Sequence, residues 1–225
     1  MRYEIKYSPA FALGVVQLEG GEAVRAEAGA MVSMSPTIQM QTEARGGVFK
    51  GLKRSVLGGE SFFINTFTAA AGGGEVTFAP ALPGDIIALE IAGQSLLIQS
   101  GSYLVNTAGI EIDTKFGGGR TFFSSEGLFL IKATGTGTIF LSSYGAVHQL
   151  DLAAGQQYIV DTGHMVAFDE SVTYEVTKAA GWKSTVFGGE GLVVWLTGPG
   201  RFYMQTRAPG SFLSWLIPKL PGRRE

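Results

Sequence analysis

The sequence predicts an all-β protein built from three tandem antiparallel β-modules with little helix. Three observations lead to this fold class. Glycine accounts for 33 of the 225 residues, well above its usual share, and no collagen-like period accompanies it. Short apolar runs rich in β-branched and aromatic residues separate the glycines, which is typical of strands joined by tight turns. One glycine frame also recurs three times, which predicts a repeat architecture.

The recurring frame consists of two glycines with seven residues between them and an apolar run after the second glycine. Glycine supplies the positive φ of tight turns without steric cost. No helical periodicity follows the frame, so it predicts turn, strand, turn and strand rather than a nucleotide-binding loop. The three copies are bounded by Gly21 and Gly29, Gly93 and Gly101, and Gly155 and Gly163.

Two further frames recur with similar periods. Glu60, Glu126 and Glu190 each open an apolar strand, at steps of 66 and 64 residues. Gly74, Gly137 and Gly200 each open another strand, at steps of 63 and 63 residues. The first frame steps by 72 and 62 residues, because an insertion near residues 44–58 lengthens the first copy. The predicted organisation is module one at 1–82 with a basic glycine-rich insertion at 44–59, module two at 83–143, module three at 144–207, and a C-terminal tail at 208–225.

Within the first module, residues 2–18 are expected to form two strands broken at Ser8-Pro9. Phe11, Leu13, Val15 and Val16 are the core candidates there. Strands at Met31–Met34 and Ile38–Met40 are expected around Pro36, with Met31, Met34 and Met40 as adaptable core filling. In the second module, strands are predicted at Ile86–Ile91, Leu96–Gln99, Tyr103–Asn106 and Ile110–Asp113.

Composition excludes several classes of protein. The net charge is −2 and only 16% of the residues are charged, so a general basic face for nucleic acid is not expected, and DNA is not an expected partner. The chain has no cysteine, which excludes disulfides and thiol chemistry. No signal peptide and no apolar run of membrane-spanning length is visible. We expect a cytoplasmic protein, with a peripheral membrane location as the alternative.

Residues 44–59 form the most basic stretch, with four positive charges and five glycines in sixteen residues. Its cations, Arg45, Lys50, Lys53 and Arg54, are the predicted binding contact for an anionic ligand, a lipid surface or RNA. The alternative is a solvated segment, helical over Phe49–Leu57, that packs Val48, Leu52 and Val56 and leaves the lysines in water.

The tail from Ser211 to Glu225 combines apolar residues at near-helical spacing with Lys219, Arg223 and Arg224. Pro218 and Pro221 limit any helix to about two turns. Phe212, Trp215 and Leu216 are the predicted contact with a partner or a membrane. Docking on the chain's own body or on a neighbouring subunit is favoured over a membrane interface.

The sequence offers little catalytic chemistry. Each of the two histidines, His148 and His164, lies three residues from an aspartate, and on a strand such a pair points to opposite faces. The His-x-His cluster of cupin-like metalloenzymes is missing, and no nucleophile elbow follows a strand. We therefore predict no catalytic residue, no metal ligand and no cofactor. A cupin-like metalloenzyme that uses both histidines stays a second alternative.

Three segments carry a family resemblance: Met31–Pro36, Gly46–Arg54 and Leu57–Phe63. They resemble the altered-inheritance-of-mitochondria (mitochondrial biogenesis) family, whose prokaryotic members are mostly of unknown function. The resemblance covers nearly the whole chain. It implies a fold like that of the tryptophan RNA-binding attenuation protein, with three small antiparallel β-sandwich modules fused in a row. None of that protein's ligand residues can be placed on this sequence. Eukaryotic members are linked to the organisation of the mitochondrial inner membrane.

The sequence therefore predicts a non-enzymatic binding or scaffold protein, related to membrane organisation, that assembles into a homo-oligomer. Modules with open sheet edges favour pairing with neighbours, which is the reason for expecting an oligomer. Binding of RNA or anionic lipid through residues 45–54 is the alternative function.

Overall fold

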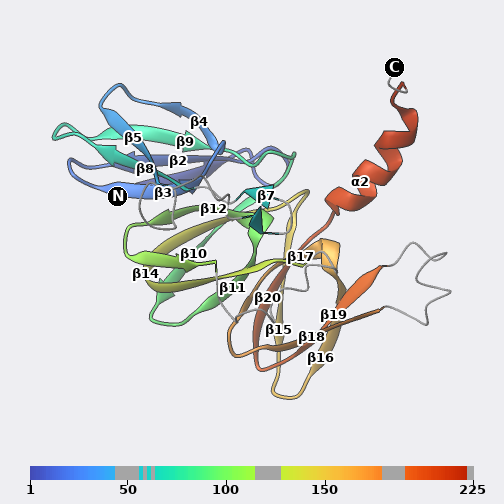
Figure 1. The fold of residues 1–225 in the computed structure, drawn as a ribbon. Helices are drawn as coiled ribbons and strands as arrows, with labels where there is room; N and C mark the ends of the chain where they lie inside the picture. Colours follow the sequence, from blue (N-terminus) through green and yellow to red (C-terminus); the bar gives the residue numbers. More distant parts are fainter. Residues whose placement is uncertain (44–55, 58–59, 62–63, 115–127, 179–190, 222–225) are drawn as a thin grey trace.

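The computed structural model describes residues 1–43, 56–57, 60–61, 64–114, 128–178 and 191–221. Within these ranges the chain is mostly β-strand in antiparallel sheets, with one α-helix near the C-terminus (Figure 1). The expected all-β class is confirmed. Glu126, Glu190 and the side chain of Glu60 lie outside the described residues, so the structure does not test the glutamate frame.

The N-terminal third forms two layers of strands. In one layer, β9 lies between β2 and β4, and β1 extends the sheet beyond β2. In the other, β8 lies between β3 and β5. The strands are β1 (Arg2–Lys6), β2 (Leu13–Leu18), β3 (Ala23–Glu27), β4 (Met31–Met34), β5 (Ile38–Glu43), β6 (Val56–Leu57), β7 (Glu60–Ser61), β8 (Ile64–Ala69) and β9 (Gly74–Phe78). Val56–Leu57 pairs with β7 as a strand, so the helical alternative is wrong at this end.

The middle third is arranged around one long strand, β14 (Leu130–Ser142). The first part of β14 pairs with β11 and β13, and its second part pairs with β10 and β12. The other elements are β10 (Ile86–Ala92), β11 (Leu96–Gln99), the 3₁₀ turn η1 (Ser100–Ser102), β12 (Tyr103–Thr107) and β13 (Ile110–Asp113). All four strands predicted between residues 86 and 113 are present within one residue of their expected ends.

The last third places β20 between β15 and β17, and β19 between β16 and β18. These pairings resemble those of the first two thirds, as a repeat would require, while the module boundaries stay a prediction. The elements are β15 (Val147–Leu152), β16 (Gln157–Asp161), η3 (Thr162–His164), β17 (Met165–Asp169), β18 (Thr173–Lys178), β19 (Leu192–Thr197), β20 (Gly200–Gln205), α2 (Pro209–Leu216) and η4 (Ile217–Lys219).

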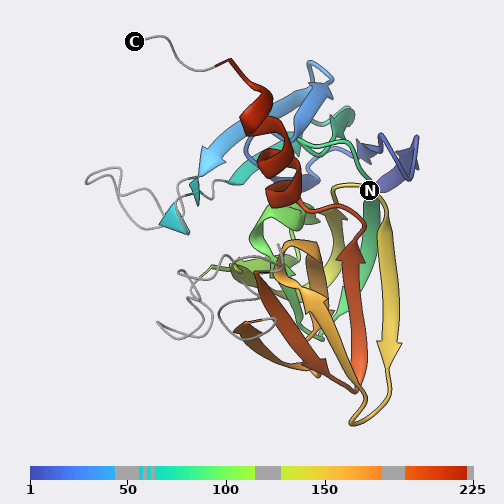
Figure 2. The same ribbon diagram turned by 90° about the vertical axis from the view of Figure 1, so that its right-hand side faces the viewer.

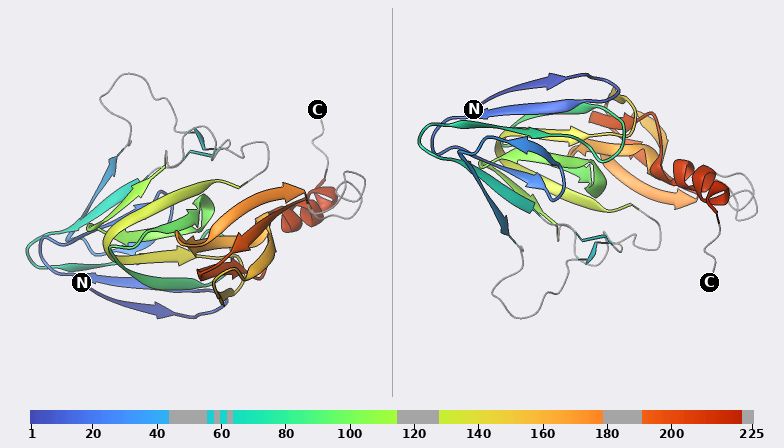
Figure 3. Two further views of the ribbon diagram at one scale, coloured as in Figure 1. Left: turned by 90° about the horizontal axis from the view of Figure 1, so that it is seen from below. Right: turned by 90° about the horizontal axis from the view of Figure 1, so that it is seen from above.

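The three parts of the chain are joined by hydrogen bonds between strands. β12 pairs with β3, and β17 pairs with β11, so one sheet runs through the molecule from β15 to β5. Buried side chains form three apolar clusters, one centred on each part, and each cluster also includes side chains from a neighbouring part. The N-terminus and α2 lie at opposite ends of the molecule (Figure 3).

The glycine frame forms the expected turns at its first position. Gly21, Gly93 and Gly155 have φ values of 85°, 91° and 75°, which an L-residue adopts only with strain. At the second position the copies differ, since Gly29 has a φ of 94° whereas Gly101 and Gly163 lie inside η1 and η3.

Several core assignments need correction. Val16 is buried, but Phe11 is 71% exposed, because it lies in the loop before β2. Met34 and Met40 are 40% and 45% exposed, so their prediction as core filling is wrong. The reason is that β4 and β5 are the end strands of their sheets. Met31 packs partly buried against the first cluster.

A buried polar network ties the first third of the chain to the second. Asn106 is fully buried, and its Oδ1 accepts a hydrogen bond of 2.6 Å from the Tyr103 hydroxyl. Its Nδ2 donates to the carbonyl oxygens of Thr107 at 2.7 Å and Ile110 at 3.0 Å. The Tyr103 hydroxyl also lies 3.2 Å from the carbonyl oxygen of Arg25 on β3.

The two large buried tyrosines should respond differently to loss of the hydroxyl. We expect Tyr103→Phe to lower the free energy of unfolding by about 1–2 kcal/mol, because it removes the donor to Asn106. The Tyr203 hydroxyl is buried without a hydrogen-bond partner among the described residues, and burial raises the pKa of Tyr203. Tyr203→Phe should therefore leave stability unchanged or raise it. Urea unfolding of both variants checks this, and equal losses would contradict it.

Candidate functional site

The predicted basic contact is not placed by the structure. Arg45, Lys50, Lys53 and Arg54 all lie in residues 44–55, outside the described part of the chain. The anion-binding prediction for this segment therefore rests on sequence alone.

The predicted C-terminal contact lies on α2 and η4, which extend away from the sheets (Figure 1). Figure 2, viewed from the side on which α2 lies, shows the helix in front of the sheets. Phe212 is half-buried, with its ring centroid 5.9 Å from that of Tyr144 and 6.2 Å from that of Trp215. Leu216 is also half-buried. Phe212 thus connects the base of the helix to the body.

Most of the apolar surface of this segment faces solvent. The exposed fractions are 49% for Leu213, 58% for Trp215, 61% for Ile217 and 56% for Leu220. The ammonium group of Lys219 lies 5.0 Å from the Trp215 ring centroid. The body of the chain does not cover these side chains, so docking on the chain's own body is wrong for them, while docking on a neighbouring subunit stays a prediction. The two-turn length that the prolines predicted is confirmed by α2 and η4.

A polar hollow of about 500 Å³ lies at the base of α2. Gln205, which is buried, connects its walls: Oε1 accepts from the Tyr144 amide at 2.8 Å, and Nε2 donates to the Gly163 carbonyl at 2.9 Å. Glu27 is the one carboxylate among its described lining residues. The hollow offers hydroxyl and amide groups, but its described walls lack the carboxylate pair or the imidazole that acid–base catalysis uses.

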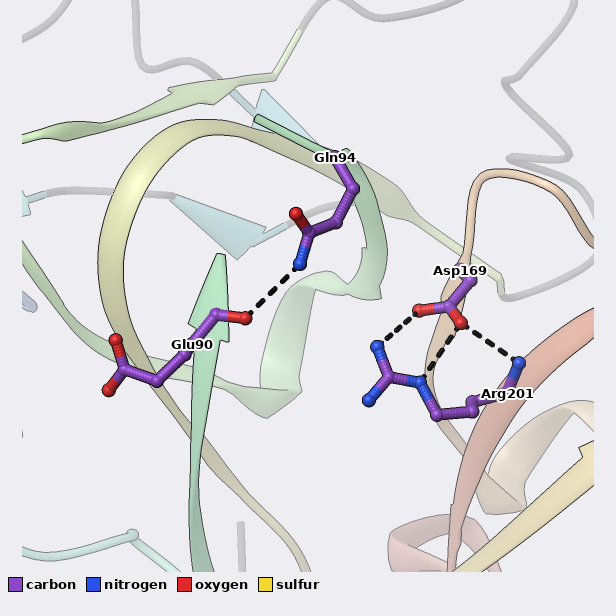
Figure 4. Close-up of polar contacts among 4 residues, drawn as sticks. All are labelled: Glu90, Gln94, Asp169 and Arg201. Atoms are coloured by element: carbon purple, nitrogen blue, oxygen red, sulfur yellow. Dashed lines mark hydrogen bonds and ion pairs between the residues drawn. The ribbon is translucent and has the colours of Figure 1, made fainter. Parts of the chain in front are cut away.

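A second hollow, of about 540 Å³, lies between the β10–β11 turn, the β17–β18 turn and Arg201. The Asp169 carboxylate accepts from the Arg201 backbone amide at 2.9 Å, from Nε at 3.1 Å and from Nη2 at 3.3 Å (Figure 4). This hydrogen bonding to Asp169 raises the pKa of the Arg201 guanidinium above its ordinary value. Across the hollow, Gln94 Nε2 donates to the carbonyl oxygen of Glu90 at 3.2 Å.

The neighbouring carboxylate in this hollow is paired as well. Glu170 Oε1 lies 2.5 Å from Lys132 Nζ. Hydrogen bonds from Lys132 and then Ser95 lower the pKa of Glu170. Because these charges already neutralise one another, we expect the two ion pairs around the hollow to hold the turns together rather than to bind a charged ligand.

The two histidines lie on opposite sides of β20. His148 on β15 and Met165 on β17 both face Met204 of β20, and His164 directly precedes Met165. The Nδ1 atom of His164 is 2.7 Å from the carbonyl oxygen of Gln205. Within the described ranges, no group of three or more His, Cys, Asp or Glu residues is arranged to hold a metal ion.

Sequence reasoning missed the exposed apolar side chains of two end strands. They are Val32 and Met34 on β4, and Tyr158 and Ile159 on β16. Nothing in these strands' local pattern distinguishes them from their buried counterparts elsewhere in the chain. The signal available was the predicted repeat, since a linear series of modules would leave a first and a last pairing edge without a partner.

Comparison with known proteins agrees with the resemblance seen in the sequence. The model of a family described as mitochondrial biogenesis AIM24 matches residues 3–207. An uncharacterised protein of Streptococcus pyogenes serotype M6 is 30% identical over 229 residues, which cover 98% of this chain and 92% of that protein. A crystal structure of a Streptococcus pyogenes protein, SPYM3_0169, superposes with a TM-score of 0.80 at 27% identity, and covers 97% of this chain and 99% of that one.

These comparisons leave two expectations open. The likeness of the fold to that of the tryptophan RNA-binding attenuation protein stays a prediction. The function also stays a prediction, because the matched relatives carry no stated activity. As for membranes, none of the helices in the described ranges combines the length and apolarity needed to cross one.

Proposed function

The chain belongs to the mitochondrial biogenesis AIM24 family, and from this premise we propose that it is a non-enzymatic scaffold protein that attaches to an anionic membrane surface through α2 and η4. The observation that carries the proposal is the exposed apolar surface of this segment. Leu213 on α2 and Ile217 at the start of η4 are one helical turn apart, since the Ile217 amide donates to the Leu213 carbonyl oxygen, and so they lie on the same side of the segment. Leu220 follows directly after η4.

The chemistry of the segment suits a membrane interface. Trp215 is 58% exposed, and amphipathic tryptophan rings favour the headgroup level of a bilayer. Between Ser211 and Glu225 the sequence carries Lys219, Arg223 and Arg224 against one acidic side chain, Glu225. Each cation near an anionic surface contributes roughly 1 kcal/mol of binding energy. The helix is short, so we expect weak, reversible attachment rather than insertion.

The decisive variant is Leu213→Ser combined with Ile217→Ser. Both side chains already face solvent, so folding should be preserved. Each loses roughly 1–2 kcal/mol of apolar burial in the interface. We expect co-sedimentation with phosphatidylserine-containing vesicles to weaken by more than about tenfold. Met40→Ser, which alters an exposed apolar side chain on β5, is the matched control and should bind as the original chain does. Equal binding by the double variant, or no vesicle binding by the original chain, would overturn the proposal.

A second candidate is binding of RNA or anionic lipid through Arg45, Lys50, Lys53 and Arg54. Four cations without an acidic residue between Ala44 and Gly59 favour it. The same assay separates the two candidates. If the basic segment is the contact, Lys50→Glu with Lys53→Glu and Arg54→Glu abolishes binding, while the Leu213 and Ile217 variant retains it.

A further inference from the structure

Two junctions between strands connect the three parts of the chain in the same register. β12 pairs with β3, and β17 pairs with β11. In the first junction, Val105 lies twelve residues after Gly93, and its partner Ala26 lies five residues after Gly21. In the second, Ala167 lies twelve residues after Gly155, and its partner Ile98 lies five residues after Gly93. Relative to the glycine frame, the two registers are identical.

The strand β4 has the features of β12 and β17, which pair with the preceding part of the chain at the two junctions. β12 shifts register against β14 between Tyr103 and Val105, and β17 shifts against β20 between Met165 and Ala167. β4 shifts in the same way against β9, between Met31 and Ser33. At the same distance from its glycine, β4 therefore carries the bulge that β12 and β17 carry.

The strand β16 has the features of β3 and β11, the strands with which β12 and β17 pair at the two junctions. β3 and β11 each use one edge for a strand of their own part, β8 and β14, and the other edge for a junction. β16 uses one edge for β19 and ends its sheet on the other. Likewise, β4 ends its sheet beyond β9. Each end of the molecule thus has one half of a junction.

Burial supports this comparison. The counterparts of the exposed residues on β4 and β16 are buried at the junctions, except Arg25, the counterpart of Ile159 on β3, which is half-buried. Val32 is 57% exposed, whereas Leu104 and Val166 are 1% and 0% exposed. Met34 is 40% exposed, whereas Asn106 and Phe168 are fully buried. Tyr158 is 38% exposed against 0% for Val24 and 4% for Leu96, and Ile159 is 47% exposed against 3% for Leu97.

Charge distinguishes these two edges from the other end strands of the three larger sheets. Charged side chains protect a free edge against pairing, and β1, β5, β15 and β18 each carry at least one. The strand β4 reads Met-Val-Ser-Met and carries none. The one charge on β16, Asp161, is engaged, because its Oδ1 accepts from the Gly163 amide at 2.8 Å.

We propose that β4 of one molecule pairs antiparallel with β16 of a second copy of the chain. The register of the two internal junctions places Ser33 opposite Val160, Met34 opposite Ile159 and Ser35 opposite Tyr158. In Figure 1, β4 and β16 lie at opposite ends of the molecule, so the pairing joins different copies. The interface is head-to-tail, which produces a closed ring or an open filament rather than a twofold dimer. The pairing is independent of α2 and of membrane attachment.

The first test is the mass of the full chain in solution by light scattering across a range of concentrations. The original chain should form species larger than the 23.8 kDa single chain. Met34→Glu with Ile159→Glu places like charges opposite each other across the interface, and both side chains are exposed in the single molecule. This variant should be monomeric, with a dissociation constant raised by more than about tenfold. Met34→Lys with Ile159→Glu should restore assembly, and Met40→Glu should leave it intact.

A register test uses the absence of cysteine from the chain. Separate Met34→Cys and Ile159→Cys molecules, mixed and oxidised, should form a cross-linked pair, because directly opposed side chains lie within reach of a disulfide. Met34→Cys mixed with Tyr158→Cys should cross-link far less, since Tyr158 points to the other face of β16. A monomeric original chain, an oligomer that survives the double glutamate variant, or equal cross-linking of both mixtures would overturn the proposal.

Discussion

Replacing Gly84 with alanine is expected to remove most of the stability of this chain. An alanine Cβ at this position would lie 1.6 Å from the carbonyl oxygen of Ser143 and 2.7 Å from its carbonyl carbon. These are main-chain atoms, so no side-chain rotation relieves the overlap. The backbone itself must move, and we expect a loss of at least about 4 kcal/mol in the free energy of unfolding, at the upper end of what single substitutions cause.

The position of Gly84 explains why the loss is large. Gly84 forms a parallel bridge with Gly145, and its carbonyl oxygen accepts from the Ala12 amide at 2.9 Å. On either side, the Asp85 amide donates to the Gly145 carbonyl at 3.0 Å, and the Gly145 amide donates to the Pro83 carbonyl at 3.0 Å. One crossing thus joins segments from all three parts of the chain.

Urea unfolding followed by circular dichroism measures the effect. Gly72→Ala is the control, because an added Cβ there meets no atom within 4 Å and Gly72 does not have a positive φ. The control should change stability by less than about 1 kcal/mol. If Gly84→Ala unfolds at the same urea concentration as Gly72→Ala, the described close approach of Gly84 to the Ser143 carbonyl group is wrong.

Asn106→Asp is expected to destabilise the chain by about 3–5 kcal/mol at neutral pH, although the two side chains have nearly the same shape. The amide nitrogen that now donates to the carbonyl oxygens of Thr107 and Ile110 would become an oxygen facing two acceptors. The site is fully buried, and an uncompensated charge in such a place is costly.

The loss should depend on pH in a defined direction. Burial and the facing carbonyl oxygens raise the folded-state pKa of the introduced carboxyl above its ordinary value near 4. The neutral acid can donate to one of the carbonyl oxygens. The free energy of unfolding of the variant should therefore be closest to that of the original chain when the pH is below this ordinary pKa. Its deficit should grow as the pH rises through the folded-state pKa and then level off.

Comparing urea midpoints of Asn106→Asp and the original chain between acidic and neutral pH checks both the size and the sign. Gln39→Glu is the matched control, because Gln39 is exposed on β5, and its midpoint should follow that of the original chain. A deficit for Asn106→Asp that stays constant with pH would contradict the buried network described above.

The local features of this protein could be predicted from its sequence. The strands from Ile86 to Asp113, the break at Ser8-Pro9 and the turns at Gly21, Gly93 and Gly155 depend on backbone preferences and on alternation over a few residues. These preferences act wherever the segment lies in the fold. The two-turn limit of the tail has the same origin, because Pro218 and Pro221 act on their own neighbours.

The tertiary structure alone decided which of these strands are interior and which lie at an edge. Met31–Met34, Tyr103–Thr107 and Met165–Asp169 follow the same frame, and yet Val32 and Met34 are exposed while their counterparts are buried. It also decided that Leu213 and Ile217 face solvent rather than the body. The physical reason is that burial depends on whether another segment covers a surface. That covering segment lies far away in the sequence, and for β4 we propose that it belongs to another molecule.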